Sequence, residues 1–401
     1  MSLFTPTNRT LSKRKSRSVK AVTALRSLTV VAGFLAHTAC QEDFIRPNLV
    51  LIALERTRVD HVNGYGGAWT RTPLFDHLAR RGLRFTNAYT STSEGGDATL
   101  DLLSGGNPAE KRPLLPEILQ RDGYVTIGSL NVRGASDPRL KVGFDELDDA
   151  GGTHEERSDR LFKLVTSHVL DEKPIFVFYQ APVVEAPYRN ASERTAAGER
   201  KVPDVDFELL QESLASGEPL DEEAAIWLAD LYAMEIGRTH DTLAGFMAPL
   251  RGWGFFNRYL TVATALAGEE LGEHGRYSPA DYLYDEVLQI PLIMASDNMM
   301  DSAIRPELVT IRDIAPTLLG YADITSDADM AGRDLLSPEQ SPREAVRSRA
   351  RDQRAVRTTE WKLIESTDGE TVELYNLVDD PREQTNVAAE HPDVVEQLRA
   401  R

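Results

Sequence analysis

The chain alternates short apolar runs with longer amphipathic stretches. Most of the short runs are apolar on both faces and rich in β-branched and aromatic residues, which is typical of buried parallel strands. Five runs predict strands, at residues 48–54, 124–128, 175–179, 259–265 and 291–294. Amphipathic patterns between them predict helices at residues 73–81, 157–170, 224–250 and 311–319. This alternation predicts an α/β fold, with a mostly parallel sheet and helices on both faces.

Two segments depart from this pattern. Residues 186–222 are polar and lack clear periodicity, and they predict a surface insertion over the end of the sheet, with a lid as one interpretation. The composition shifts again near residues 337–343; beyond it, residues 361–364 and 371–375 predict antiparallel strands and residues 392–399 a closing helix. We therefore predict an α/β domain over residues 44–335 and a small α+β subdomain over residues 336–401.

Residues 1–40 have the layout of a secretory signal. A basic, Ser/Thr-rich stretch ends at Arg26, an apolar run follows over residues 27–36, and small residues precede Cys40. The apolar run is too short to span a bilayer as a stable helix. We expect an exported bacterial protein, either periplasmic or membrane-anchored, with a disordered cytoplasmic tail as the alternative. Small residues before a cysteine also resemble a lipoprotein box. Whether Cys40 is lipidated stays open, and a lipid on Cys40 is the route by which we expect any membrane contact.

Charge and cysteine content limit the partners and the nucleophiles that this protein can use. The chain has 63 acidic and 45 basic side chains, a net charge of −18, although its first 41 residues carry no Asp or Glu. An acidic body repels phosphates, which argues against a nucleic-acid partner. Cys40 is the only cysteine. The folded domain therefore cannot use a nucleophile derived from cysteine.

The end of the first predicted strand carries a dense group of polar side chains. In a parallel sheet, ligands bind beyond the carboxyl ends of the strands, so residues 55–61 should project into that crevice. This stretch contains Glu55, Arg56, Arg58, Asp60 and His61. Pairing of Arg58 with Asp60 at a loop surface explains the same residues equally well.

A wider pattern accompanies this stretch. The segment from Arg46 to His61 resembles the opening strand of sulfatases, within the alkaline-phosphatase-like superfamily. Further segments agree in order and spacing: 65–66, 72–89, 102–105, 268–275, 283–294, 313–319 and 373–386. The resemblance covers about residues 46–400 and implies the sulfatase fold.

The resemblance also implies a nucleophile within a Cys/Ser-x-Pro-x-Arg motif, and here that motif is replaced. Counted back from residues 102–105, the nucleophile place is Gly95, the proline place is Asp97 and the arginine place is Thr99. Glycine offers no side chain to activate, and nucleophilic catalysis needs an activated oxygen, sulfur or nitrogen. Loss of the arginine also removes a positive partner for an anion.

The metal place that the resemblance implies is altered too. The family holds a calcium-type cation through carboxylate and amide oxygens, the ligands that hard cations prefer. Glu55 keeps a carboxylate at the first-strand place, but Arg56 follows it, and the late-strand pair is Leu266 and Ala267. We therefore expect no cofactor, or at most weak residual Ca²⁺ or Mg²⁺ on Glu55.

The remaining substrate-contacting places are also changed. Glu185 stands at a histidine place, and Asp281 lies near a late lysine or histidine place. Acidic groups there would repel sulfate or phosphate. The surviving polar groups are Arg58, Asp60, His61 and His274. A lone surviving histidine is more often structural than catalytic.

Two functions remain open. The first is a sulfatase-like pseudoenzyme that binds a sulfated or phosphorylated glycan, a small ester or a protein partner; its oligomeric state is not predicted. The second is an ester hydrolase with a rebuilt site, using Ser91, Thr92, Ser93 or Thr99 as nucleophile with new ligands from Glu94, Asp97, Glu269 or Glu270. A surviving hard-cation site would bring oxygens of at least three of five carboxylates to within about 2.6 Å of one point. These five are Glu55, Asp60, Glu94, Asp97 and Glu269.

Overall fold

The computed structural model describes most of the chain from residue 46 onward. The described residues are 46–67, 70–106, 113–181, 188, 207–216, 219–252, 258–275, 277, 282–296, 302–326, 328–338 and 341–401. Residues 46–401 form one compact unit. The predicted leader and Cys40 lie outside the described residues, so export and lipidation stay predictions.

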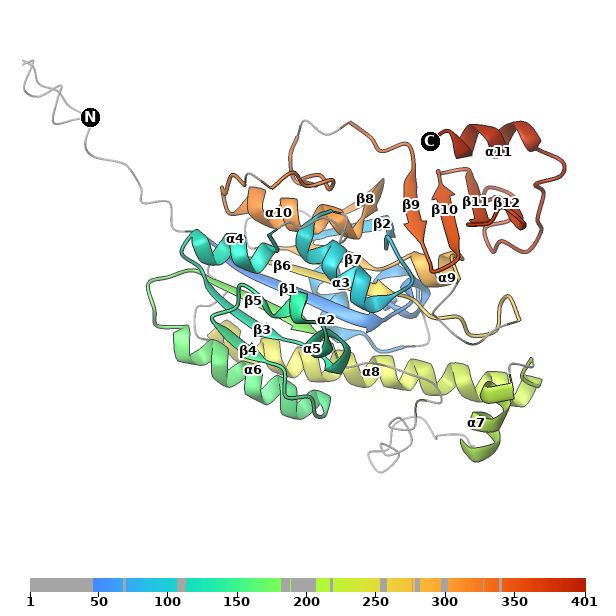
Figure 1. The fold of residues 1–401 in the computed structure, drawn as a ribbon. Helices are drawn as coiled ribbons and strands as arrows, with labels where there is room; N and C mark the ends of the chain where they lie inside the picture. Colours follow the sequence, from blue (N-terminus) through green and yellow to red (C-terminus); the bar gives the residue numbers. More distant parts are fainter. Residues whose placement is uncertain are drawn as a thin grey trace, which may run out of the picture. The chain divides into compact units, whose positions relative to one another are not determined.

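An eight-stranded sheet forms the centre of this unit (Figure 1), with the strand order β4-β3-β5-β1-β6-β7-β2-β8. The strands are β1 Asn48–Arg56, β2 Leu83–Tyr89, β3 Val125–Ser129, β4 Glu146–Asp148, β5 Ile175–Gln180, β6 Tyr259–Ala267, β7 Leu292–Ala295 and β8 Ala303–Thr310. Strand β7 runs antiparallel to both β6 and β2, whereas the other pairs are parallel. The prediction of a mostly parallel sheet is confirmed.

Helices pack on both faces of this sheet. Figure 1 shows α6 and α8 along one face and α3, α4 and α10 along the other. The helices of this unit are α2 Pro73–Ala79, α3 Gly95–Ser104, α4 Leu115–Arg121, α5 Val132–Ser136, α6 His154–His168, α8 Glu222–Gly252, α9 Asp285–Leu288 and α10 Ile314–Tyr321. The four helices predicted from periodicity correspond to α2, α6, α8 and α10.

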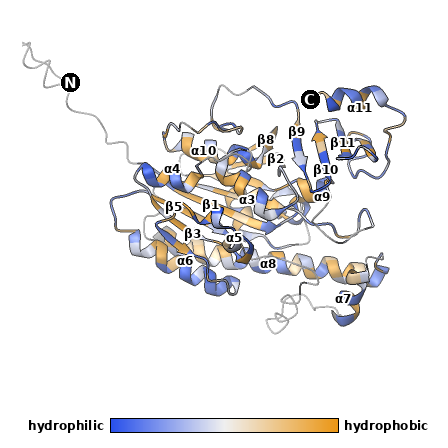
Figure 2. Ribbon diagram, in the orientation of Figure 1, coloured by the Kyte–Doolittle hydropathy of each residue, from blue (hydrophilic) through white to orange (hydrophobic). Residues whose placement is uncertain are grey.

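The burial of β1 explains why polar chemistry gathers at its end. Strand β1 lies between β5 and β6, and every residue from Leu49 to Arg56 is buried. Figure 2 shows the apolar residues concentrated in this sheet and on the inward helix faces. A strand covered on both faces tolerates apolar side chains along its length. Its first charged side chains, Glu55 and Arg56, therefore appear only where the strand leaves the core.

The C-terminal part forms a second, antiparallel sheet. Its strands are β9 Val346–Arg349, β10 Gln353–Arg357, β11 Trp361–Ser366 and β12 Val372–Asn376, and helix α11 Pro392–Arg399 packs against it. The sheet contacts the segment after β2, because the Ser348 hydroxyl donates to the Thr90 carbonyl at 2.7 Å and the Arg349 amide donates to the Ser91 carbonyl at 2.9 Å. The predicted α+β architecture is confirmed, while the boundary at residue 336 stays a prediction.

Two segments differ from what the sequence indicated. Helix α7, Phe207–Ser216, lies inside the predicted insertion and was not predicted; its Leu210 is buried with Leu228 and Leu231 of α8. Most other residues between 182 and 206 lie outside the described residues, so the lid interpretation stays untested. Residues 136–139, where no helix or strand was predicted, contain the end of α5 and the start of a 3-10 turn, Pro138–Lys141.

Within the part of the chain that the structure describes, no helix has both the length and the apolar character needed to cross a membrane.

Candidate functional site

The candidate site is built where several strands end at the same edge of the central sheet. Glu55 lies at the end of β1, Gln180 at the end of β5 and Glu269 just after β6. Asn131 follows β3, and α3 begins at Gly95 after β2. Because these strands are parallel, their carboxyl ends bring these residues to one edge of the sheet. The place that the sequence indicated for the site is therefore the place where the polar side chains meet.

The carboxylate of Glu55 occupies the space beside Gly95. A Cβ atom built on Gly95 would lie 2.5 Å from Oε1 of Glu55, closer than real Cβ atoms approach any neighbour. Both residues are buried, and Glu55 is only 2% exposed. The nucleophile place thus lacks a side chain of its own, and the Glu55 side chain from the end of β1 occupies the space where one would begin.

Two partners hold Glu55 in that position. The side-chain amide of Asn131 donates to Oε2 at 2.8 Å, and the Arg133 guanidinium lies 3.5 Å from Oε1. Asn131 is fixed in turn, because it donates to the Ala181 carbonyl and accepts from the Gly134 amide, each at 2.8 Å. Burial raises the pKa of Glu55, and the Asn131 hydrogen bond opposes that rise.

The calcium-type site that the resemblance implies does not fit these residues. The Arg56 guanidinium is buried beside the sheet end, with Nη1 3.4 Å from Oε2 of Glu269. Burial raises the pKa of Glu269 to about 7, with Arg56 opposing the rise. Leu266 and Ala267 are buried and offer no ligand atoms. A fixed guanidinium thus lies among the groups that would face the ion.

The five carboxylates singled out from the sequence do not assemble into a cation site. Among the described residues, Glu270, His274 and Glu286 are the one group of three or more His, Cys, Asp or Glu side chains whose ligand atoms lie within 4.8 Å of one another. None of Glu55, Asp60, Glu94, Asp97 and Glu269 belongs to it. The condition for a surviving hard-cation site at those five residues is not met.

Two of the four candidate nucleophile hydroxyls, those of Ser91 and Thr99, donate hydrogen bonds within the structure. Ser91 donates to the carboxylate of Asp101, and both side chains are buried. Thr99 donates to the Gly95 carbonyl at 2.7 Å and accepts from Gln180 at 3.0 Å. The Asp101 carboxylate is itself ion-paired with Arg312 at 2.9 Å and Arg349 at 3.2 Å. The two Thr99 bonds tie the first turn of α3 to the end of β5.

Arg58, Asp60 and His61 form a compact ion-paired group. Arg58 binds Asp60 through two hydrogen bonds of 3.0 and 2.7 Å, and Nη1 also donates to Glu273 at 2.5 Å. Nδ1 of His61 lies 2.8 Å from Asp60. Burial opposes ionisation of Asp60, but hydrogen bonds from His61 and Arg58 outweigh it and lower its pKa. The pairing of Arg58 with Asp60 foreseen from the sequence is present.

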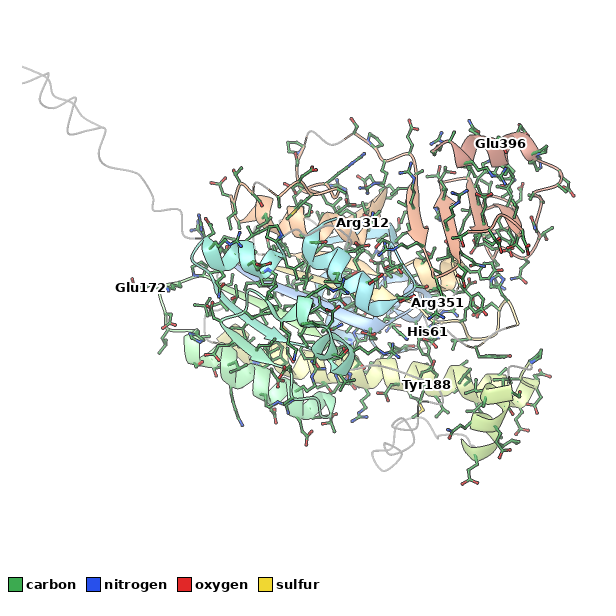
Figure 3. The ribbon with its side chains drawn as sticks, in the orientation of Figure 1. His61, Glu172, Tyr188, Arg312, Arg351 and Glu396 are labelled. Atoms are coloured by element: carbon green, nitrogen blue, oxygen red, sulfur yellow. The ribbon has the colours of Figure 1, made fainter. Side chains whose placement is uncertain are left out.

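This group is held by the inner face of α8. The Tyr232 hydroxyl accepts from the Arg58 amide at 2.9 Å and donates to the Arg56 carbonyl at 3.3 Å. The His61 ring meets the Tyr232 ring edge-on at 4.9 Å, and the Tyr188 ring lies 5.5 Å from it. Figure 3 labels His61 and Tyr188, which both lie close to α8. These contacts give His61 a packed, structural environment.

His274 lies apart from the ion-paired group. Its ring stacks on Tyr284 with centroids 3.6 Å apart, and Nε2 is 3.5 Å from Oε2 of Glu286. Glu185 and Asp281, the other two altered places, lie outside the described residues.

Sequence reasoning did not identify three arginines around the first turn of α3. Arg133 approaches Glu55, Arg349 lies 3.2 Å from Asp97, and Arg139 interacts electrostatically with Asp97. Their side chains are 39%, 36% and 57% exposed, and that of Arg139 also pairs with Asp137 at 2.7 Å. We call these three residues the arginine rim. Arg133 could have been found from its place after a predicted strand, but Arg349 comes from the second sheet.

Comparisons with known proteins agree with this architecture. Residues 47–181 match the family model described as Sulfatase, and residues 272–401 match the model described as N-sulphoglucosamine sulphohydrolase, C-terminal. Arylsulfatase K of Bos taurus is 25% identical over 214 residues, covering 48% of this chain and 39% of that protein. The match thus spans less than half of that relative. N-acetylglucosamine-6-O-sulfatase of Bacteroides thetaiotaomicron is 22% identical over 474 residues, covering 86% of this chain and 83% of that protein.

Solved structures show the same fold. The phosphonate monoester hydrolase of Agrobacterium radiobacter superposes with a TM-score of 0.69 at 18% identity, covering 88% of this chain and 96% of that chain. A structure described as a 2-O GAG sulfatase superposes with a TM-score of 0.73 at 17% identity, covering 88% of this chain and 90% of that chain. At these identities the structural likeness establishes the fold.

Proposed function

The chain belongs to the sulfatase family, and from this premise we propose that it is an exported sulfatase-like protein that has lost ester hydrolysis and binds a sulfated ligand. The main support for a loss of hydrolysis is the position of the Glu55 carboxylate, which fills the volume beside Gly95. A nucleophile at residue 95 and the present conformation of Glu55 exclude each other sterically. Export rests on the pattern of residues 1–40 alone.

Electrostatics around α3 supports the loss of hydrolysis. An attacking group at this helix would need a base and a cation to stabilise developing charge. The guanidinium of Arg56, at the end of β1, already faces the Glu269 carboxylate at 3.4 Å. Removal of one member of a cooperating catalytic unit can lower turnover by about 10⁶-fold. In this chain the nucleophile and several of its supporting groups are replaced together.

The arginine rim supports ligand binding. Arg133, Arg139 and Arg349 present partly exposed guanidiniums around the first turn of α3, and guanidinium groups match the planar oxygen edges of sulfate and phosphate. Family relatives named above include an N-acetylglucosamine-6-O-sulfatase, and one structural neighbour was solved with its substrate D-glucosamine-2-N,6-O-disulfate. A sulfated amino sugar is therefore the ligand class that we propose.

Hydrolysis is tested with aryl sulfate and aryl phosphate esters, with and without Ca²⁺, Mg²⁺ and Zn²⁺. We expect no release of phenol above the rate of the buffer control with any metal. Turnover that disappears in Glu55→Ala would refute the proposal and establish the alternative, an ester hydrolase with a rebuilt site.

Binding is tested by calorimetry with size-defined heparin oligosaccharides and their desulfated counterparts. We expect binding of the sulfated form alone, with affinity falling as salt rises. Arg133→Ala and Arg139→Ala should each weaken binding about 10-fold, because each removes one charge-assisted contact worth about 1.5 kcal/mol. The matched control is Arg121→Ala on α4, whose exposed side chain lies outside the rim. Equal weakening in the control would show nonspecific charge attraction and refute the assignment of the rim.

A further inference from the structure

Glu270 is a buried carboxylate without a hydrogen-bond partner. The residue is 1% exposed, and neither Oε1 nor Oε2 has a partner. Burial of an ionised carboxylate without compensation is costly, so such groups are normally paired or bound to a metal. Nε2 of His274 and Oε2 of Glu286 are likewise buried and lack partners that meet hydrogen-bond geometry. These three side chains face one another, with ligand atoms within 4.8 Å.

The spacing of these atoms suits a metal ion better than a direct hydrogen bond. Nε2 of His274 and Oε2 of Glu286 lie 3.5 Å apart, whereas direct hydrogen bonds of this type span about 2.7–3.2 Å. Two ligands on a tetrahedral zinc ion, each about 2.1 Å from it, lie about 3.4 Å apart. The pair already has this separation, and Glu270 offers a third ligand atom within 4.8 Å of those of the other two side chains.

The backbone brings the two ligand-bearing segments together without the ion. Glu270 and His274 come from the loop after β6, and Glu286 comes from α9. The Gly268 amide donates to the Val287 carbonyl at 2.8 Å, and the Glu269 amide donates to the Glu286 carbonyl at 3.2 Å. A Cβ atom on Gly268 would collide with that Glu286 carbonyl, so only glycine permits this approach. The loop and helix are therefore fixed side by side before any ligand binds.

The imidazole of His274 is also fixed in orientation. Its ring lies parallel to the Tyr284 ring, with 7° between the planes, and the Tyr284 hydroxyl donates to Glu373 at 3.0 Å. Fixed rings and a fixed backbone reduce the entropy lost when a metal binds. Among the cations that act on Glu270, His274 has the largest effect; Arg58 has a smaller one and already binds Asp60 and Glu273. Arg58 therefore supplies little of the positive charge that the two carboxylates need.

We propose that Glu270, His274 and Glu286 bind one divalent transition-metal ion, with zinc as the best match. One imidazole nitrogen and two carboxylate oxygens are typical zinc ligands, whereas Ca²⁺ and Mg²⁺ prefer all-oxygen sets. The ion ties the loop after β6 to α9, the helix whose Asp285 also holds the second sheet through Lys362. This site uses none of the residues at Gly95 and Glu55, so it stands whether or not the proposed loss of hydrolysis is correct.

The test uses the full chain, stripped with a chelator and dialysed. Calorimetric titration with Zn²⁺ is expected to show one ion per chain, and titration with Co²⁺ is expected to give the visible absorption of a four-coordinate site. Glu270→Gln and His274→Ala should each weaken Zn²⁺ binding at least 100-fold. Glu270→Gln keeps the side-chain shape and removes the charge, and circular dichroism checks that the variant remains folded.

The matched control is His168→Asn. His168 also lies between two carboxylates, Asp171 at 2.8 Å and Glu146 at 3.7 Å, but this group is exposed at another edge of the sheet. The control should bind one Zn²⁺ with unchanged affinity. Absence of Zn²⁺ binding by the unmodified chain, unchanged affinity in Glu270→Gln, or stronger binding of Ca²⁺ than of Zn²⁺ would each overturn the proposal.

Discussion

Replacement of Gly95 by alanine probes the contact on which the proposed function rests. The new Cβ atom would lie 2.5 Å from Oε1 of Glu55, whereas ordinary contacts begin near 3.4 Å. One of the two groups must therefore move by about 0.9 Å. The Gln180 side chain at the end of β5 donates to Thr99 and ties the helix to the sheet, so the carboxylate is the part expected to move.

The expected cost follows from what Glu55 loses when it moves. Its 2.8 Å hydrogen bond from Asn131 is charge-assisted, and such a bond contributes about 1.5–3 kcal/mol. Overpacking in a buried site adds about 1–3 kcal/mol. Alanine recovers up to about 1 kcal/mol relative to glycine in a helix. Because the carboxylate keeps part of its interactions after a small shift, we expect Gly95→Ala to lower the free energy of unfolding by about 2 kcal/mol.

The assay is urea unfolding followed by fluorescence and circular dichroism, with Gly96→Ala as the matched control. Gly96 is the next residue of the same helix, and a Cβ atom there meets nothing within 4 Å. Gly96→Ala should be neutral or stabilising by up to about 1 kcal/mol. A double-mutant cycle with Glu55→Ala isolates the contact, because Gly95→Ala should cost nothing once the carboxylate is absent.

Two results would refute the reasoning. Equal stability of Gly95→Ala and Gly96→Ala would mean that the carboxylate does not fill the volume beside residue 95. A cost of Gly95→Ala that persists in the Glu55→Ala background would mean that some other neighbour resists the side chain.

Three further predictions concern the stability of the unit. Burial lowers the pKa of His240 from 6.5 to about 3. The contribution of neutral His240 to folding stability is therefore present in full above pH 6.5 and is lost as the pH falls toward 3. In urea unfolding, His240→Phe should reduce the loss of stability between pH 7.5 and pH 5 by about 2 kcal/mol. Lys362 is fully buried and binds Glu383 at 2.8 Å, so Lys362→Met should lower the free energy of unfolding by about 3–5 kcal/mol, and an unchanged urea midpoint would contradict this. Arg343 donates to the buried carboxylate of Asp313 through hydrogen bonds of 2.6 and 2.7 Å. Arg343→Ala should lower the free energy of unfolding by a similar amount, about 3–5 kcal/mol. An increase in stability would instead show that the Asp313 carboxylate needs no cation.

Much of the fold was predictable because its core elements have strong local patterns. The run at residues 48–54 predicted β1 nearly to its ends, and helix α11 begins and ends where its periodicity does. Helix α7 was missed because its buried Leu210 contacts α8, a tertiary contact that leaves little trace in ten residues of sequence. The antiparallel direction of β7 was not predicted either, since a four-residue apolar run carries no information about strand direction.

The candidate site was predictable in place but not in content. Counting along the chain identified Gly95 as the nucleophile place, and strand-end reasoning placed Glu55 nearby. Neither could show that the two compete for one volume, because that depends on the conformation of the Glu55 side chain. The group of Glu270, His274 and Glu286 was hidden for a similar reason, since hydrogen bonds of Gly268 and Glu269 set the register between its two segments.

The guanidinium of Arg56 beside Glu269 has a consequence for how this protein responds to its surroundings. A dissociable cation leaves its carboxylates when its concentration falls, but a positive charge carried on the chain stays at full occupancy at any dilution. The positive charge beside Glu269 is therefore part of the covalent chain, so dilution or dialysis cannot remove it.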